Sequence, residues 1–164
     1  MAGYTLRLAR PEDADVIAHH RVEMFRDMGE LRSEALAEEL RTATRASLVP
    51  RLAAGAYVGW LAVVPAGRVI AGAGVDIKPQ LPRVALGGTR IVAADVPLVV
   101  NVYTEPEYRR QGIARALMLA LMEWARTTAA DRVVLHASSA GRALYESLGF
   151  VATNEMLWRT DSGG

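Results

Sequence analysis

A strand, a turn and an amphipathic helix between residues 98 and 124 constrain the fold of this chain most strongly. Residues 98–104 are mostly apolar and rich in β-branched and aromatic side chains, which predicts a buried strand that ends before Pro106. From Ile113 to Trp124 the apolar residues recur at intervals of three and four, which predicts a helix with one buried stripe. The centre of the chain is therefore expected to be a strand–turn–helix unit.

The turn of this unit has the composition of an anion-binding site. The first N–H groups of a helix have no intrahelical partner and carry a partial positive charge, so they can hold a phosphate that nothing bulky blocks. Gly112 and Ala114 leave that approach open, and Arg109, Arg110 and Arg115 add positive charge around it. The same residues would also suit an ordinary turn with a solvated basic rim.

Two motifs in this region resemble those of a known family. Residues 109–114, Arg-x-x-Gly-x-Ala, resemble the pyrophosphate-binding signature of the GCN5-related N-acetyltransferase (GNAT) superfamily. Residues 104–110 resemble the linker before that signature, and residues 138–150, Ser-x-x-Gly-x-x-Leu-Tyr-x-x-x-Gly-Phe, resemble the second motif. The motifs occur in the family's order, so the resemblance covers most of the chain. Residues 79–95 match no feature of the family.

The resemblance implies acetyl-CoA as the acetyl donor. Main-chain N–H groups of the central strand would bind the thioester oxygen, at Val102, and the pantetheine arm, and one such donor to a developing oxyanion typically contributes about 3 kcal/mol. Ser138 departs from the asparagine that the family often has at its position. The implied cofactor-binding residues are Val102, Tyr103, Thr104, Arg109, Arg110, Gln111, Gly112, Ile113, Ala114, Arg115, Ser138 and Tyr145.

The same resemblance gives one candidate acid and leaves the base open. Tyr145 matches a tyrosine that in many family members can protonate the departing thiolate, although it could instead only pack the short helix against the sheet. An amine acceptor must lose a proton, usually to a carboxylate or through water. Glu23, Asp76 and Glu105 are the base candidates, and each could equally be an ordinary solvated carboxylate. The family has no common position for the base.

The remaining pattern predicts an α/β fold with a mixed sheet and helices on both faces. The resemblance implies the acyl-CoA N-acyltransferase fold. In this fold the strand before the anion-binding turn at residues 109–115, here called the anion cradle, and the parallel strand before the second motif splay apart. Residues 79–95 are expected to be a loop or a poorly formed hairpin. Strands are expected at 4–9, 56–64, 68–77, 98–104, 131–137 and 150–159, and helices at 14–28, 33–54 with an interruption near Pro50, 113–128 and 140–148.

Two glycines and three histidines need separate interpretation. Gly72 and Gly74 in an expected strand indicate either a close approach of another group or a bulge. His19 and His20 are adjacent and point about 100° apart on a helix, so we expect no zinc site and no other metal. His136, at a strand end, could line the cofactor cleft but is more often satisfied by the backbone.

Composition limits the class of protein. At 164 residues, 51% hydrophobic and 23% charged, the chain is expected to be one soluble globular domain spanning 1–164, with a frayed tail at 161–164. The balance of 19 basic and 18 acidic residues argues against a nucleic-acid surface. The absence of cysteine, of a signal peptide and of a long apolar run favours a cytoplasmic protein without a membrane anchor.

The leading interpretation is an acetyl-CoA-dependent N-acetyltransferase that acts on a primary amine of a small molecule, peptide or protein by direct attack on the thioester. The alternative is a non-catalytic module that binds and senses acetyl-CoA. A dinucleotide-binding or P-loop protein is disfavoured because the required glycine spacing and Gly-Lys-Ser/Thr are missing. Met118, Leu119 and Met122 lie off the main apolar stripe, which suggests either a homodimer interface or a second covered face of the helix.

Overall fold

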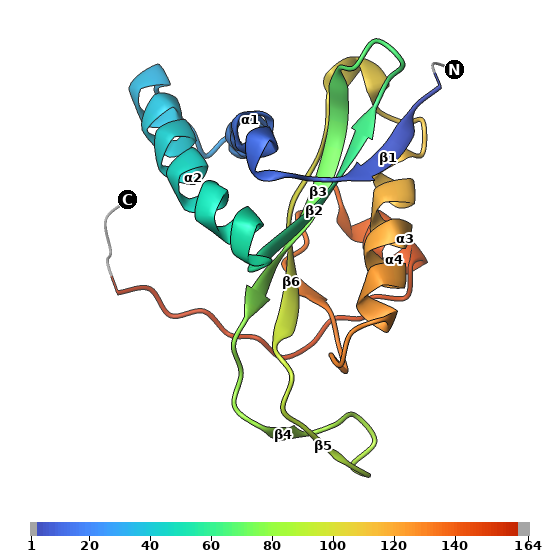
Figure 1. Cartoon of the computed structure of the whole chain (residues 1–164). Helices are drawn as coiled ribbons and strands as arrows, with labels where there is room; N and C mark the ends of the chain where they lie inside the picture. Colours follow the sequence, from blue (N-terminus) through green and yellow to red (C-terminus); the bar gives the residue numbers. More distant parts are fainter. Residues whose placement is uncertain (1–2, 161–164) are drawn as a thin grey trace.

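The computed structural model describes residues 3–160 and has a five-stranded sheet at its centre (Figure 1). The order of the strands is β1-β2-β3-β6-β7, and every neighbouring pair is antiparallel except the parallel pair of β6 and β7. The predicted mixed sheet is therefore confirmed. The strands of this sheet are β1 (Thr5–Leu8), β2 (Tyr57–Val63), β3 (Val69–Lys78), β6 (Val96–Thr104) and β7 (Val134–Leu135).

The helices lie on both faces of the sheet, as predicted. In Figure 1, α1 and α2 lie on one side of the strands and α3 and α4 on the other. Two short 3₁₀ helices, Pro11–Asp13 and Pro106–Tyr108, precede α1 and the turn before α3. The α-helices are α1 (Ala14–Asp27), α2 (Glu34–Ala54), α3 (Ile113–Arg126) and α4 (Arg142–Ser147). Within residues 3–160, none of the helices is long and apolar enough to cross a membrane.

Helix α2 has clear start and stop signals but no break at its proline. The Ser33 hydroxyl accepts a hydrogen bond from the Leu36 N–H, and Gly55 ends the helix with a φ of 71°. The predicted interruption near Pro50 is wrong, because the helix continues through it. Pro50 and Ala46 are both exposed, so the carbonyl that loses its intrahelical partner can bond to water.

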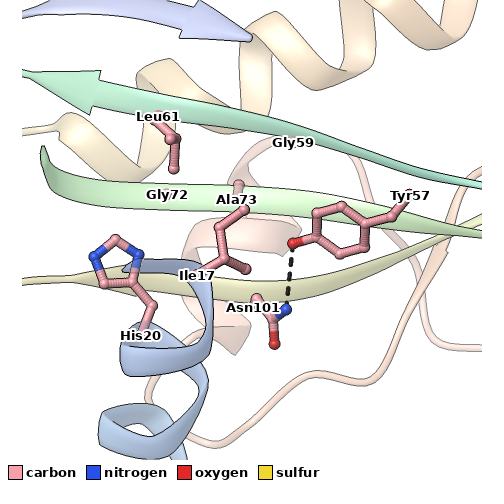
Figure 2. A pocket seen from close by; sticks show the side chains of 8 residues that line it. All are labelled: Ile17, His20, Tyr57, Gly59, Leu61, Gly72, Ala73 and Asn101. Atoms are coloured by element: carbon pink, nitrogen blue, oxygen red, sulfur yellow. Dashed lines mark hydrogen bonds between the residues drawn. The ribbon is translucent and has the colours of Figure 1, made fainter. Parts of the chain in front are cut away.

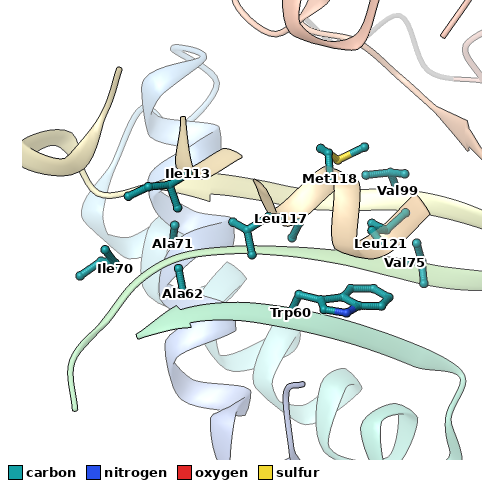
Figure 3. Packing of buried hydrophobic residues seen from close by; sticks show 11 residues of the cluster. Trp60, Ala62, Ile70, Ala71, Val75, Val99, Ile113, Leu117, Met118 and Leu121 are labelled. Atoms are coloured by element: carbon teal, nitrogen blue, oxygen red, sulfur yellow. The ribbon is translucent and has the colours of Figure 1, made fainter. Parts of the chain in front are cut away.

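Separate apolar layers cover the two faces of the sheet. On one face, Leu117, Met118 and Leu121 of α3 pack on Trp60 and Val75 of the sheet (Figure 3). On the other face, residues of α1 and α2 pack on Tyr57 and Leu61. Successive strand residues point to opposite faces, which is why neighbours such as Trp60 and Leu61 belong to different layers. Of the three α3 residues off the main apolar stripe, Met118 is fully buried, Met122 is half-buried and Leu119 is 48% exposed, so they do not form one covered face.

One further segment agrees with the sequence-based prediction of a loop or poorly formed hairpin, and another differs from its prediction. Residues 79–95 contain a two-stranded hairpin of β4 (Arg83–Val84) and β5 (Ile91–Val92), at the bottom of Figure 1. The strand predicted at 150–159 does not form, and residues 151–160 are exposed and have no regular structure. A strand needs a neighbour to pair with, and β7 is only two residues long and lies at the edge of the sheet. The tail expected at 161–164 lies outside the described residues.

Candidate active site

The parallel strands at the centre of the site separate soon after they pair. Leu98 lies opposite Val134 and Val99 opposite Leu135, and β6 then continues to Thr104 without β7 beside it. Beyond Val99, β6 is therefore paired on one side only, with β3. Main-chain groups on the open side of β6 are available to a ligand, and this is the predicted splay.

A bulge lies in β6 where this opening begins. Gly74 pairs with Val100 and Gly72 with Tyr103, so two residues of β6, Asn101 and Val102, lie opposite a single residue of β3. Asn101 has a φ of 57°, a left-handed conformation that asparagine tolerates better than most residues. The bulge turns the Val102 side chain to the α3 face and leaves Asn101 on the opposite face.

Both predicted roles of the strand glycines are confirmed. A Cβ on Gly74 would lie 2.1 Å from the Tyr57 hydroxyl, and one on Gly72 would lie 3.1 Å from Nδ1 of His20. The same two glycines flank the register shift opposite the bulge. Figure 2 shows Tyr57 and Asn101 hydrogen-bonded to each other, with Ile17 between this pair and His20.

The predicted anion cradle is an open turn that leads into α3. Gly112 precedes the helix with a φ of 78°, and a Cβ on it would meet no atom within 4 Å. Arg110 also has a positive φ, 62°. The structure thus keeps the helix N-terminus free of side chains at the point where a phosphate would approach.

The arginines of the cradle do not have equal roles. Nε of Arg109 donates to the Thr104 carbonyl at 2.9 Å, and its Nη2 lies 2.6 Å from Oδ2 of Asp27, so this guanidinium fastens β6 to α1. Arg115 donates to the Ser147 hydroxyl at 2.9 Å and so connects α3 to α4. These contacts fix two of the charges at the cradle.

The second motif forms a compact turn and a short helix. Oγ of Ser138 accepts a hydrogen bond from the Gly141 N–H at 3.2 Å, and a Cβ on Gly141 would lie 2.8 Å from the Tyr145 ring. The Tyr145 ring packs edge-on against Phe150 and the α3-side core. Burial raises the pKa of the Tyr145 hydroxyl. The ring therefore has a packing role.

A cavity of about 320 Å³ lies on the opposite face of β6, between this strand and helix α2. Its volume is that of a site for a small molecule. Asn101, which reaches it from the bulge, donates to the Tyr57 hydroxyl at 3.2 Å. Burial raises the pKa of Tyr57 to about 12, so this phenol stays neutral. The charged residues of the cavity wall are Arg21, Arg51 and Asp76.

The three predicted base candidates lie in different surroundings. Asp76 lines the cavity, but one carboxylate oxygen lies 2.5 Å from Arg51 and the other 2.6 Å from Lys78. Glu23 pairs with Arg26 one turn away and does not line the cavity. Glu105 follows β6 directly and contacts histidines of α1. The structure therefore does not bring the three carboxylates together.

Two histidines and a tyrosine surround Glu105. Nε2 of His19 lies 3.0 Å from Oε1 of Glu105, and Nε2 of His20 lies 4.0 Å from the same oxygen. The Tyr103 ring centroid lies 5.1 Å from that of His20. His20 is 1% exposed, its Nε2 has no hydrogen-bond partner among residues 3–160, and burial lowers its pKa to about 4.

Sequence reasoning missed this cluster. It considered the histidines only as metal ligands, and Glu105 is 86 residues away from His19. Both histidines lie off the apolar stripe of the first predicted helix, so the periodicity gave no signal for their contact with Glu105. His136 lies apart from the cluster, 2.5 Å from Glu155. Within residues 3–160, no group of three or more acidic, histidine or cysteine side chains is placed to hold a metal ion.

Comparisons with known proteins agree with this geometry. Residues 17–150 match the sequence model of the Acetyltransferase (GNAT) family. A GCN5-related N-acetyltransferase from Ralstonia eutropha superposes with a TM-score of 0.80 at 30% identity, over 96% of this chain and 98% of that one. A predicted acetyltransferase from Clostridium acetobutylicum, solved with acetyl-CoA, gives 0.80 at 25% identity over 96% of each chain.

A curated relative shares a shorter region. Glucosamine 6-phosphate N-acetyltransferase from Trypanosoma brucei brucei is 33% identical over 88 residues, which are 54% of this chain and 54% of that protein. The matched region thus spans about half the length of this relative.

Proposed function

The chain belongs to the Acetyltransferase (GNAT) family, and from this premise we propose that it is an N-acetyltransferase that moves the acetyl group of acetyl-CoA to a primary amine by direct attack on the thioester. The observation that carries the proposal is the separation of β6 from β7 beyond Val99 and Leu135, directly before the open turn at Gly112. This arrangement would offer strand N–H groups and a helix N-terminus to one ligand. The acetyl-CoA bound to the Clostridium acetobutylicum neighbour supports the choice of donor.

The residues at the opening between β6 and β7 and at the Gly112 turn suit a phosphate-bearing thioester. The open space at Gly112, where a Cβ would meet no atom within 4 Å, is the feature that fits the pyrophosphate. The implied set from Arg109 to Arg115 would hold it. In this set Arg110 would be a mobile charge, Arg115 is held by Ser147, and Arg109 anchors the strand. Val102, Tyr103 and Thr104 would bind the pantetheine arm, and Ser138 and Tyr145 would lie near its end. Acetyl-CoA would supply an activated acyl carbon.

Three groups of the chain would carry the chemistry. The main-chain N–H of Val102, in the bulge, would stabilise the oxyanion. Glu105 is our choice of base, because it directly follows β6 and contacts a histidine, whereas both oxygens of Asp76 are held by cations and Glu23 is paired with Arg26. It would take the ammonium proton directly or through His19, which is in hydrogen-bond contact with it. Tyr145 would give a proton to the sulfur as the carbon–sulfur bond breaks and the amide bond forms, and the proton that the new amide nitrogen loses would go to water or back to the tyrosine.

We propose a small molecule as the acceptor, because the cavity beside the bulge has a volume of about 320 Å³. A panel of amines with acetyl-CoA, followed by release of free thiol, tests this choice and the reaction together. The panel includes glucosamine 6-phosphate, for which the Trypanosoma brucei brucei relative is named, as well as amino acids, polyamines and short peptides. Turnover of peptides alone would contradict the small-molecule acceptor.

Calorimetry with acetyl-CoA separates this proposal from a non-catalytic sensor. We expect one molecule bound per chain and turnover of at least one amine. Tight binding without turnover across the panel would favour the sensor. No heat and no thermal shift at millimolar acetyl-CoA, with folded protein, would refute both functions.

The possible homodimer rests on residues 151–160. Val151, Met156, Leu157 and Trp158 are 80–93% exposed, and apolar side chains in such number are rarely left in water. We propose that this segment packs on a second copy of the chain. Light scattering should give a dimer for the wild type and more monomer for Trp158→Ser, with Leu119→Ser on α3 as a control. The proposals that residues 1–164 form one domain and that the protein is cytoplasmic stay predictions.

A further inference from the structure

The cavity beside the bulge contains one cation without a carboxylate partner. Asp76, the one acidic residue among those that line the cavity, is bound by Arg51 and Lys78. Arg21 forms no ion pair with any residue between 3 and 160. Two arginines thus line the cavity beside a single carboxylate that Lys78 also neutralises, which leaves the cavity with an excess of positive charge.

The guanidinium of Arg21 is held in place by neutral groups. Its Nη1 donates to Oδ1 of Asn101 at 2.7 Å, and its Cζ lies 5.1 Å from the centroid of the Phe25 ring. Asn101 is 6% exposed and is fixed in turn by its hydrogen bond to Tyr57. A guanidinium has five N–H donors in a planar fork, so Asn101 uses only part of its capacity. A cation fixed in this way is preorganised for a ligand, because little side-chain entropy remains to be lost.

We infer that the acceptor amine carries an anionic group, a carboxylate or a phosphate, and that Arg21 binds it. An ammonium compound without such a group would enter a cavity that already has excess positive charge and would be repelled. An anionic oxygen would instead form charge-assisted hydrogen bonds to the free donors of Arg21. The contact with Asn101 also places Arg21 beside the bulge, where the Val102 N–H would hold the thioester oxygen. In the acceptor, the anionic group and the reacting amine are therefore expected to be only a few bonds apart. This inference rests on the proposed function.

Matched pairs of acceptors test the inference. One pair is an α-amino acid and its carboxamide, and the other is glucosamine 6-phosphate and glucosamine; the two pairs distinguish carboxylate from phosphate. Thiol release with acetyl-CoA gives kcat/KM for each compound. We expect the wild type to favour the anionic member of at least one pair by about tenfold to a hundredfold, the range of one or two charge-assisted hydrogen bonds.

Arg21→Gln should remove this preference by lowering kcat/KM for the anionic member while the neutral member changes less than about threefold. Arg21→Lys should keep part of the preference, because it retains the charge but loses the planar fork. Arg45→Gln is the matched control. Arg45 lies on α2 and pairs with Asp15 outside the cavity, so this substitution should leave kcat/KM unchanged for both members of each pair. The affinity for acetyl-CoA, measured by calorimetry, should be the same in all three variants.

Equal kcat/KM for the two members of both pairs, or equal losses for both members in Arg21→Gln, would overturn the inference while the N-acetyltransferase function stood. Absence of turnover for every amine would instead refute the proposed function. In that case calorimetric titration with the same pairs decides: binding of an anionic member that Arg21→Gln abolishes supports the anion site, and no such binding overturns it.

Discussion

Arg83 and Asp131 form an ion pair between the β4–β5 hairpin and the segment that leads into β7. Arg83 also donates to the Ala94 carbonyl at 2.8 Å, at the far end of the hairpin. Asp131 is 3% exposed and is bound by Arg132 as well. The two arginines, Arg132 foremost, hold the pKa of the Asp131 carboxyl well below its usual range. The region that matched no feature of the family is therefore fastened to the segment that leads into β7, the strand at the edge of the sheet.

The first prediction concerns this ion pair. Asp131→Asn should destabilise the protein by about 2 kcal/mol, because Arg83 keeps its charge in a covered position without a carboxylate. The cost is below that of a deeply buried pair, since Asp131 is covered mainly by the two arginine side chains at the surface. Glu123→Gln is the control, because its pair with Arg126 is exposed and should contribute less than about 0.5 kcal/mol. Urea unfolding that gives equal midpoints for the two variants would contradict the prediction.

Local sequence patterns predicted the central elements well because the residues that specify each element are contiguous in the sequence. The stripe from Ile113 to Trp124 and the apolar run before Pro106 gave α3 and β6, and the parallel splay came from the family resemblance. The segment 150–159 has the same β-prone composition but no strand to pair with, which no local pattern reveals. The anchoring of residues 79–95 was equally hidden, because it depends on a residue 48 positions further along the chain.

The second prediction is a loss of stability in acid that is caused by His20. Its folded pKa of about 4 lies below the ordinary value of 6.5, owing to burial and, secondly, to the neighbouring His19. Between these pH values the unfolded state binds more protons than the folded state. The contribution of neutral His20 to the free energy of unfolding is therefore fully present above about pH 6.5 and is lost as the pH decreases toward 4. The difference corresponds to roughly 3 kcal/mol.

Denaturant melts between pH 7 and pH 4 measure this effect. His20→Gln removes the titrating group, so its stability should depend less on pH in this window, whereas the exposed His136→Gln should follow the wild type. The carboxylate nearest to His20 is Glu105, 4.0 Å from Nε2. If Glu105 stabilised the imidazolium, the wild type would not lose stability in this window, and the prediction would be wrong.

The site was predictable where function depends on the backbone and unpredictable where it depends on distant side chains. Gly112 could be predicted from the sequence because it matches the family's signature, and its left-handed, open turn is a backbone feature that such a signature encodes. The grouping of Arg21, Asn101 and Tyr57 was not visible, because they come from three elements and meet only at a bulge. A bulge leaves little trace in sequence beyond the glycines of the opposite strand.

The third prediction concerns the cradle. Gly112→Val should lower the affinity for acetyl-CoA more than tenfold, because its branched side chain would occupy the open space at the helix N-terminus. The substitution also strains a position with a φ of 78° and should cost about 1–2 kcal/mol of stability. Gly87→Val provides a matched comparison, since Gly87 has a φ of 95°, equally open surroundings and a place in the β4–β5 turn. Calorimetry should show normal acetyl-CoA affinity for Gly87→Val despite a similar loss of stability.

The fourth prediction concerns Tyr145. Tyr145→Phe keeps the ring that packs on Phe150, so stability and acetyl-CoA affinity should change little. The variant lacks the hydroxyl that would protonate the departing sulfur, so turnover should fall roughly tenfold to a hundredfold. The effect stays moderate because a thiol titrates near 8.5, so the thiolate leaves partly without help.

The measurement is turnover at saturating acetyl-CoA and amine, with a single-turnover experiment to establish that the chemical step limits the rate. Tyr4→Phe is the control, because Tyr4 precedes β1 at the opposite edge of the sheet and should leave turnover unchanged. An unchanged chemical rate in Tyr145→Phe would assign the residue to packing alone, since its contacts with Phe150 and with the core on the α3 side would then explain its position fully. A loss confined to acetyl-CoA affinity would make it a binding residue, and in either case another group, or water, would have to protonate the sulfur.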